Sequence, residues 1–228
     1  MMTVSNESRS RIKKVFEPMA LGMGRLGLTP DALTLIGFGI TVVGAVLVAQ
    51  QLWALGGLVI LFGGVFDMFD GTLARATGRV SNLGAFMDSV FDRAGEVIVY
   101  IGLVAGLQEL GILNGTVLAA AAMGSAVLVS YVRSKSEGLG FTSGSGMAAI
   151  GIMTREVRLV VLSVGLVLAD VIGVNPDNSS CVTCAGALAV PPGALVLFLA
   201  LGIITVGSTL TVIQRILHVR QQARRQSI

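Results

Sequence analysis

The stretch FDMFDGTLARATGRVSNLGAFMDSVFDR, Phe66 to Arg93, places four aspartates inside a very apolar chain. They are Asp67, Asp70, Asp88 and Asp92, and runs of Val, Leu, Ile and Gly flank them on both sides. An aspartate at the centre of a membrane helix costs about 2.5–3.5 kcal/mol, and four close carboxylates also repel one another. The stretch therefore predicts that these side chains meet a positive partner.

The composition is that of a membrane protein. Of the 228 residues, 54% are hydrophobic and 13% are charged, and the mean hydropathy is +0.84. In a soluble domain about a quarter of the residues are charged. The length is that of about one domain.

Six apolar segments are long enough to cross a bilayer. A hydrocarbon core of about 30 Å needs about 20 helical residues. We predict an all-α membrane protein with six transmembrane helices, at Ala32–Gln50, Leu52–Thr77, Asn82–Leu107, Ile112–Arg133, Val157–Ile172 and Gly193–Leu217. Residues 29–228 would form this transmembrane domain, and residues 1–28 an interfacial segment before it.

The basic residues indicate the orientation. With six spans, all 16 Lys and Arg residues fall on one side, and the opposite connections near Gln51, Glu109 and Asp177 have none. Since Lys and Arg concentrate in cytoplasmic loops, both termini are predicted to be cytoplasmic. The net charge of +3 is explained by this topology, and no nucleic-acid partner is expected.

Two segments outside the spans carry weaker signals. Ser5–Glu17 has apolar residues at helical spacing, which predicts an amphipathic helix on the membrane surface that Pro18 ends or kinks. The alternative is a disordered basic arm, and no cleavable signal peptide is visible. Cys181 and Cys184 lie in the predicted outer loop, where they either form a disulfide or have no special role.

The aspartates are predicted to share one face of a helix pair. Gly78 is suited to cap the second helix, and Ser81 or Asn82 to begin the third, so the short connection makes them antiparallel neighbours. The spacings are three residues in one pair and four in the other, and both spacings bring side chains together. All four carboxylates then lie about 9–16 Å from the helix ends, at one depth.

A divalent cation is the partner that suits this cluster. Arg75 and Arg93 could balance part of the charge, but clusters of carboxylate oxygens are typical of Mg²⁺, Mn²⁺ or Ca²⁺ sites. Four carboxylates are enough for two ions about 3.5–4 Å apart, an arrangement that promotes displacement at phosphorus. Gly71, Ala74 and Gly84 would leave room for a ligand, although small residues also serve close helix packing.

The pattern D-x2-D-G-x2-A-R-x8-G-x3-D-x3-D, beginning at Asp67, resembles the complete signature of the CDP-alcohol phosphotransferases. The resemblance implies that a second alcohol replaces CMP on a CDP-linked alcohol, with Mg²⁺ or Mn²⁺ as cofactor. It also implies that Asp67, Asp70, Asp88 and Asp92 bind metal, with Asp92 as ligand, general base or both. The nucleotide or CDP-lipid would meet Asp31, Thr34, Gly71, Ala74, Arg75 and Gly84.

A second cluster of charge is basic. SYVRSKSEGLG and TREVR contribute Arg133, Lys135, Arg155 and Arg158, which could converge on an anionic acceptor such as a phosphate monoester. A helix N-terminus, where TREVR lies, also favours anions. The alternative is that these residues only anchor the cytoplasmic side.

With LGLTPDALTLIGF, these stretches resemble the actinobacterial phosphatidylinositol phosphate synthases. That resemblance implies CDP-diacylglycerol as donor, inositol 1-phosphate as acceptor, a homodimer, and a bacterial inner-membrane location with a cytoplasmic active site. One alternative is a phosphatidylglycerophosphate synthase that uses glycerol 3-phosphate. A cation transporter is the alternative from another class, but the acidic residues lie near one face and no repeats or broken helices are evident.

Overall fold

The computed structural model describes residues 18–141, 150–174 and 190–226. A helical segment at residues 18–25 leads into the bundle, and no strand occurs in these ranges. The predicted amphipathic helix at Ser5–Glu17, Cys181 and Cys184 lie outside the described residues. The main helices are α2 (Pro30–Ala49), α3 (Trp53–Phe66), α4 (Met68–Thr77), α5 (Asn82–Glu109), α6 (Leu113–Gly138), α7 (Arg155–Ile172) and α8 (Pro192–Gln226).

Four stretches within the described ranges are long and apolar enough to cross a membrane: Pro30–Ala49, Trp53–Thr77, Asn114–Gly138 and Pro192–Arg224. The remaining long helices, α5 and α7, carry several charged residues each. The prediction of an all-helical chain with several such helices is confirmed, and the count of six spans stays a prediction.

Local sequence signals set the helix ends, and those at Gly78 and Ser81 are as predicted. Thr29 accepts a hydrogen bond from the Ala32 N–H at the start of α2, and Ser81 accepts one from the Gly84 N–H at the start of α5. Gly78 ends α4 in the left-handed conformation, with φ of 67°. Side-chain oxygens satisfy N–H groups at helix starts, and glycine adopts positive φ without strain.

The second predicted helix is divided at Asp67, which separates α3 from α4. Asp67 keeps right-handed helical angles, with φ of −56° and ψ of −26°. The break therefore requires no unusual backbone conformation, and the sequence gives no sign of it. Helices α6 and α8 also run past their predicted ends at Arg133 and Leu217. Their extra turns are polar, so an apolar pattern cannot detect them.

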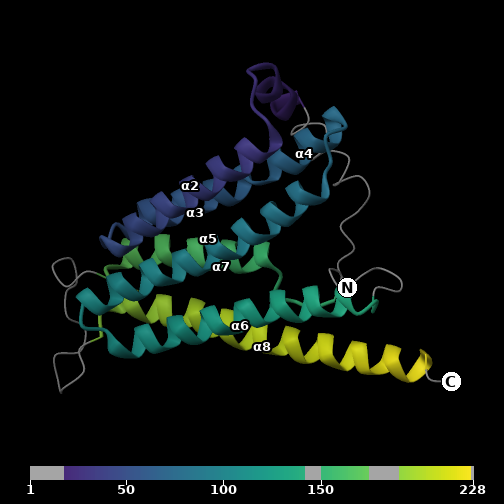
Figure 1. Ribbon diagram of the computed structural model, residues 1–228. Coiled ribbons are helices and arrows are strands. Elements are labelled where there is room, and N and C mark those ends of the chain that lie inside the picture. Colours follow the sequence, from purple (N-terminus) through teal and green to yellow (C-terminus); the bar gives the residue numbers. More distant parts are fainter. Residues whose placement is uncertain (1–17, 142–149, 175–189, 227–228) are drawn as a thin grey trace.

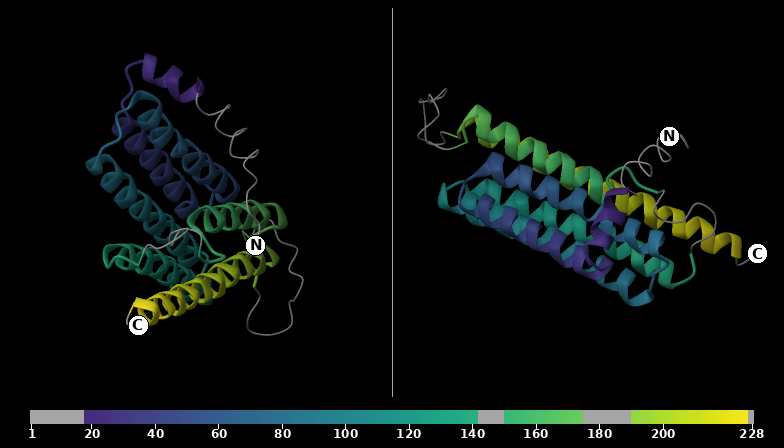
Figure 2. Two further views of the ribbon diagram at one scale, coloured as in Figure 1. Left: turned by 90° about the vertical axis from the view of Figure 1, so that its right-hand side faces the viewer. Right: turned by 90° about the horizontal axis from the view of Figure 1, so that it is seen from above.

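The helices form a closed ring. In the order α2, α5, α6, α8, α7 and α3, each packs on the next, and α3 packs back on α2. Figure 1 shows α2 and α3 diverging from α6 and α8 toward the end that carries the 77–82 turn, and α8 extends past the others (Figures 1 and 2). The 77–82 turn and the far end of α8 lie at the same end of the bundle (Figure 1).

Gly102 and Gly106 allow α2 and α5 to approach closely. A Cβ at Gly102 would lie 2.3 Å from the Ala45 carbonyl oxygen, and one at Gly106 would lie 2.6 Å from that of Val48. Neither helix could move closer or accept a side chain there. This contact joins α2 to the half of α5 remote from the aspartates.

The apolar core fills the half of the bundle remote from the aspartates. Fully buried large side chains there include Trp53, Leu103, Leu107, Leu166 and Leu197. They come from the ends of α3, α5, α7 and α8 that lie away from the 77–82 turn. The bundle is therefore closed by packing at one end, and its polar groups gather toward the other.

Candidate metal centre and active site

Three of the four aspartates meet at one point. Asp67, at the break between α3 and α4, Asp70 on α4 and Asp88 on α5 each offer a carboxylate oxygen, and these oxygens lie within 4.8 Å of one another. The predicted convergence of two neighbouring helices is observed for these three residues. They would repel one another unless a cation lay between them.

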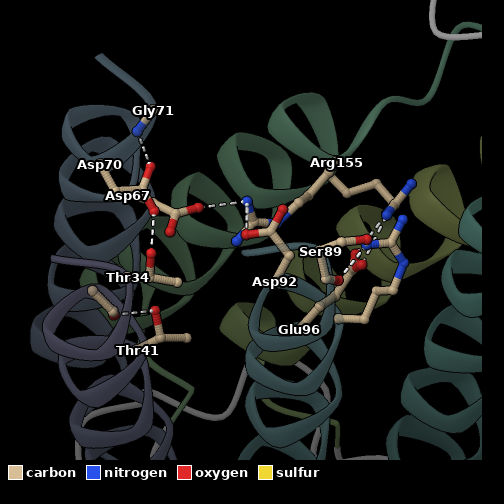
Figure 3. Close-up of polar contacts among 12 residues, drawn as sticks. Thr34, Thr41, Asp67, Asp70, Gly71, Ser89, Asp92, Glu96 and Arg155 are labelled. Atoms are coloured by element: carbon tan, nitrogen blue, oxygen red, sulfur yellow. Dashed lines mark hydrogen bonds and ion pairs between the residues drawn. The ribbon is translucent and has the colours of Figure 1, made fainter. Parts of the chain in front are cut away.

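Asp70 is the most firmly held of the three. Its side chain is buried, and its Oδ2 atom lies 2.6 Å from the Thr34 hydroxyl, which donates from α2 (Figure 3). Its Oδ1 atom accepts a hydrogen bond from the backbone N–H of Gly71. Both oxygens are thus oriented by neighbours, in the way that groups behind a metal ligand orient it.

Asp92 is not part of the three-carboxylate group. Its Oδ1 atom lies 2.7 Å from Nη1 of Arg155, and the same nitrogen donates to Oδ2 of Asp67 at 2.9 Å (Figure 3). Arg155 therefore bridges Asp67 and Asp92. Asp92 lies one helical turn beyond Asp88, at the level where α7 places Arg155. The spacing of residues 66–93 could not reveal this contact, because Arg155 comes from another helix.

A second ion pair lies one further turn along α5. Arg158 donates to both Glu96 oxygens, at 2.6 Å and 2.8 Å, and its side chain is only 1% exposed. A charge this deeply buried needs such a partner. Sequence reasoning missed Glu96, although its position four residues after Asp92 was a usable signal.

Between these two ion pairs lies a cavity of about 30 Å³. Its polar lining comes from Thr41, Glu96, Tyr100, Arg155 and Arg158. The volume is close to that of one water molecule. A cavity of this volume has room for ordered water and is too small for a nucleotide or a sugar phosphate.

The four predicted acceptor cations do not form one group. Arg155 and Arg158 lie together at the start of α7, as their spacing predicts. Arg133 pairs instead with Glu137 at an exposed position on α6, at 3.0 Å, and Lys135 is exposed on the same helix. The neighbours of α6 in the ring are α5 and α8, so these two residues stand farther round the bundle.

Arg215 on α8 is a buried cation that the sequence reasoning assigned only to orientation. It is 3% exposed, and its guanidinium donates to the carbonyls of Ile150, at 3.0 Å, and Val129, at 2.6 Å. The positive charges of Arg133 and Arg158 repel the positive charge of Arg215. Its position inside the apolar run Gly193–Leu217 was the signal, because a cation there is costly.

The predicted nucleotide-binding residues border the carboxylates from the open end. A Cβ on Gly84 would lie 3.3 Å from Oδ1 of Asp31, and one on Gly71 would lie 3.3 Å from Nη1 of Arg75. Ala74 lies one turn after Asp70 and is half-buried. The starts of α2 and α5 thus lie side by side at Asp31 and Gly84, and the roles of these residues stay predictions.

The donor set fits a hard divalent cation. Three carboxylates offer only oxygen, the ligand that Mg²⁺ and Mn²⁺ prefer. Thr34 and Gly71 supply the outer hydrogen bonds that such sites use to fix a ligand. The group contains no nitrogen or sulfur donor, which softer metal ions would favour.

Comparison with known proteins agrees with this chemistry. The family model for CDP-alcohol phosphatidyltransferases matches residues 27–220. The phosphatidylinositol phosphate synthase of Cutibacterium acnes is 35% identical over 218 residues, covering 91% of this chain and 93% of its own. The archaetidylinositol phosphate synthase of Pyrococcus horikoshii is 36% identical over 154 residues, covering 68% of this chain and 77% of its own.

A solved structure is also similar. The phosphatidylinositol phosphate synthase of Mycobacterium tuberculosis with CDP-DAG bound has a TM-score of 0.73 and 26% identity, covering 90% of this chain and 94% of that one. The same protein in complex with manganese and citrate has a TM-score of 0.72, covering 90% of this chain and 88% of that one. With the signature aspartates in place and the family model spanning both ends of the bundle, the chain belongs to the CDP-alcohol phosphatidyltransferase family.

Proposed function

We propose that the protein transfers the phosphatidyl group of CDP-diacylglycerol to inositol 1-phosphate and releases CMP. The observation that carries the proposal is the convergence of Asp67, Asp70 and Asp88, with Asp70 oriented by Thr34. The names and bound ligands of the similar proteins support this choice of donor and acceptor. Phosphoryl transfer needs mainly positioning and neutralised charge, and this site offers both.

The donor would lie with its diphosphate over the three carboxylates. Divalent metal held there, as one or two ions, would neutralise the diphosphate and stabilise the departing CMP. Asp31 and Gly84 on one side and Gly71, Ala74 and Arg75 on the other would border the cytidine. The missing side chains at the glycines leave the space that a flat base needs.

Asp92 is the candidate general base. It stands outside the three-carboxylate group, so its oxygens are not all committed to metal. In the reaction an acceptor hydroxyl oxygen bonds to the phosphatidyl phosphorus, and the bond from that phosphorus to the CMP oxygen breaks. Asp92 would take the hydroxyl proton, provided that the acceptor displaces the guanidinium of Arg155 that now pairs with it.

The acceptor phosphate would bind among the arginines. Arg155 is 30% exposed and adjoins Asp92, so it is the arginine open to a phosphate. Arg158, paired with Glu96, and the buried Arg215 lie behind it. Guanidinium groups suit phosphate because they donate in pairs. Arg133 and Lys135 on α6 would add positive charge at the edge of this site. They would reach the acceptor only through their long, flexible side chains or through the bound anion itself.

The topology proposed with this function has six spans, both termini in the cytoplasm and the active site on the cytoplasmic side of a bacterial inner membrane. The charges of α5 and α7 satisfy one another through Asp92 with Arg155 and Glu96 with Arg158. Internal pairing of this kind lets charged helices cross a bilayer. A homodimer belongs to the same proposal.

The test is a comparison of acceptors. Purified protein in detergent receives CDP-diacylglycerol with Mg²⁺ or Mn²⁺ and, in parallel, inositol 1-phosphate, glycerol 3-phosphate or inositol. Lipid mass spectrometry and CMP release are expected to show phosphatidylinositol phosphate alone, and chelation should stop the reaction. Phosphatidylglycerophosphate as the main product would favour the other synthase, and metal-dependent ion flux without CMP would favour a transporter.

A further inference from the structure

The entry to α7 is tied to α8 at one side chain. Residues 150–154, here called the α7 entry, connect the segment after α6 to Arg155 and have no regular secondary structure. The backbone N–H groups of Ile152 and Met153 both donate to Oγ1 of Thr211, at 3.2 Å and 3.0 Å. These two bonds join positions 58 and 59 residues apart in the sequence.

Thr211 uses its hydroxyl completely in this contact. While accepting both N–H groups, it donates its own proton to the Gly207 carbonyl at 2.8 Å. The side chain is 0% exposed, so water cannot replace it. Backbone N–H groups outside a helix need a partner where water is excluded, and Thr211 is that partner for both.

The surfaces at this contact are shaped for each other. Gly151 has φ of +115°, and a Cβ there would lie 2.2 Å from Cγ2 of Thr211. On the same face of α8, a Cβ on Gly207 would lie 2.4 Å from Cε of Met153. Both glycines let the α7 entry lie directly on α8, which leaves it little freedom to shift.

The α7 entry in turn fixes the first arginines of α7. The guanidinium of Arg158 donates to the Met153 carbonyl at 3.0 Å, and the Arg158 N–H donates to the Thr154 carbonyl at 3.1 Å. Thr154 makes no side-chain capping bond to the α7 backbone, but its side chain hydrogen-bonds to Glu156 in the first turn, and the contacts of Arg158 tie that turn to the α7 entry. A movement of Met153 would shift Arg158 through its bond and Arg155 through the chain.

We propose that Thr211 is a positioning residue for the acceptor: by holding the backbone of Ile152 and Met153, it sets where Arg155 presents its guanidinium group, with the Arg158–Glu96 pair fixed behind it. It contacts neither substrate nor metal. The inference rests on the proposed function, because it assigns Arg155 to the acceptor phosphate. Thr211, on α8, would act on the acceptor site indirectly, through the backbone of the α7 entry.

The test compares three variants with wild type in transfer to inositol 1-phosphate. Thr211→Val keeps the shape and removes the hydroxyl, and we expect the acceptor KM to rise about tenfold, as small misplacements of binding groups do. We expect kcat, the KM for CDP-diacylglycerol and the Mn²⁺ affinity to change less than about twofold. Thr211→Ser keeps the hydroxyl and should restore the acceptor KM.

Thr209→Val is the matched control. Thr209 lies on the same helix, and its hydroxyl donates to the Thr205 carbonyl at 2.8 Å, but its side chain is exposed. It should leave all constants unchanged. An unchanged acceptor KM in Thr211→Val, or equal losses in acceptor KM, donor KM and Mn²⁺ affinity, would overturn the positioning role.

A measurement on the wild type covers the case in which Thr211→Val does not fold. Hydrogen exchange should show the amides of Ile152 and Met153 protected at least about 100-fold relative to an unstructured chain, despite their place outside any helix. Exchange at the rate of an unstructured chain would show that Thr211 does not hold the backbone of Ile152 and Met153. Wild-type protein that makes no phosphatidylinositol phosphate would refute the proposed function instead. The exchange result would still test whether Thr211 holds this backbone.

Discussion

Arg155, the first residue of α7, donates from Nη1 to Oδ2 of Asp67 at 2.9 Å, across 88 residues of sequence. The same nitrogen lies 2.7 Å from Oδ1 of Asp92. One guanidinium thus supplies positive charge between an aspartate of the three-carboxylate group and the candidate base. Arg155 and a metal ion would compete for Asp67.

Replacing Arg155 with Gln should therefore tighten metal binding. Removing a positive charge in contact with Asp67 is expected to raise Mn²⁺ affinity roughly tenfold without substrates, since close charges at a half-buried site interact by a few kcal/mol. The acceptor KM should rise at the same time. Electron paramagnetic resonance of free Mn²⁺ gives the affinity, and CMP release gives the KM.

Arg93→Gln is the control for charge at a distance. Arg93 bonds to the carbonyl and hydroxyl of Ser89, and its positive charge acts on Asp88 through space. Its loss should tighten Mn²⁺ binding much less. Equal effects of the two variants would show that direct competition at Asp67 is not the cause.

Asp70→Asn should abolish transfer while the protein still inserts and folds. The amide keeps the size and can still accept from Thr34, but it removes one of three negative charges at the cluster. We expect CMP release to fall roughly 10³-fold or more, the scale on which charge stabilisation contributes to phosphoryl transfer. A variant with normal thermal stability and more than a tenth of wild-type activity would contradict this assignment.

Thr34→Val should weaken the metal site through Asp70. The variant loses the 2.6 Å hydrogen bond that orients Oδ2, and losses of such outer bonds reduce metal affinity or activity about 10–100-fold. Titration with Mn²⁺ measures the change, and Thr34→Ser should restore it. Thr41→Val, on the same helix with a bond only to the Gly37 carbonyl, should leave the Mn²⁺ affinity as it is.

Glu96→Ala should destabilise the fold strongly. It leaves Arg158 buried at 1% exposure without its carboxylate, and breaking such a pair costs about 3–5 kcal/mol. Glu137→Ala removes the partner of the exposed Arg133 and should cost less than about 1 kcal/mol. Thermal unfolding in detergent compares the two; similar melting temperatures would argue against a structural role for the Glu96 pair.

Much of the site was readable from the sequence because its information is local. Asp67, Asp70 and Asp88 are placed by helix periodicity and by a short turn whose ends Gly78 and Ser81 mark. These rules act within a few residues, so they hold before the chain packs. The same is true of the apolar lengths that predict helices able to span a membrane.

The break at Asp67 and the ion pair of Asp92 with Arg155 were not readable in this way. The ion pair depends on how α7 packs on α3, because that packing places Arg155 beside residues 66–93. The sequence does not name the partners of Arg133, Arg158 and Arg215. In the structure the first is exposed beside Glu137, the second is paired with Glu96, and the third is bonded to carbonyls of two other segments.

By itself, the order of residues determined the helical class, the helix ends around the aspartate turn and the convergence of three carboxylates, because periodicity and capping operate over one or two turns. Only the tertiary structure decided which cation meets which carboxylate, and that Thr211 holds the start of α7. Those contacts join residues tens of positions apart, and their geometry exists only once the ring of helices has closed.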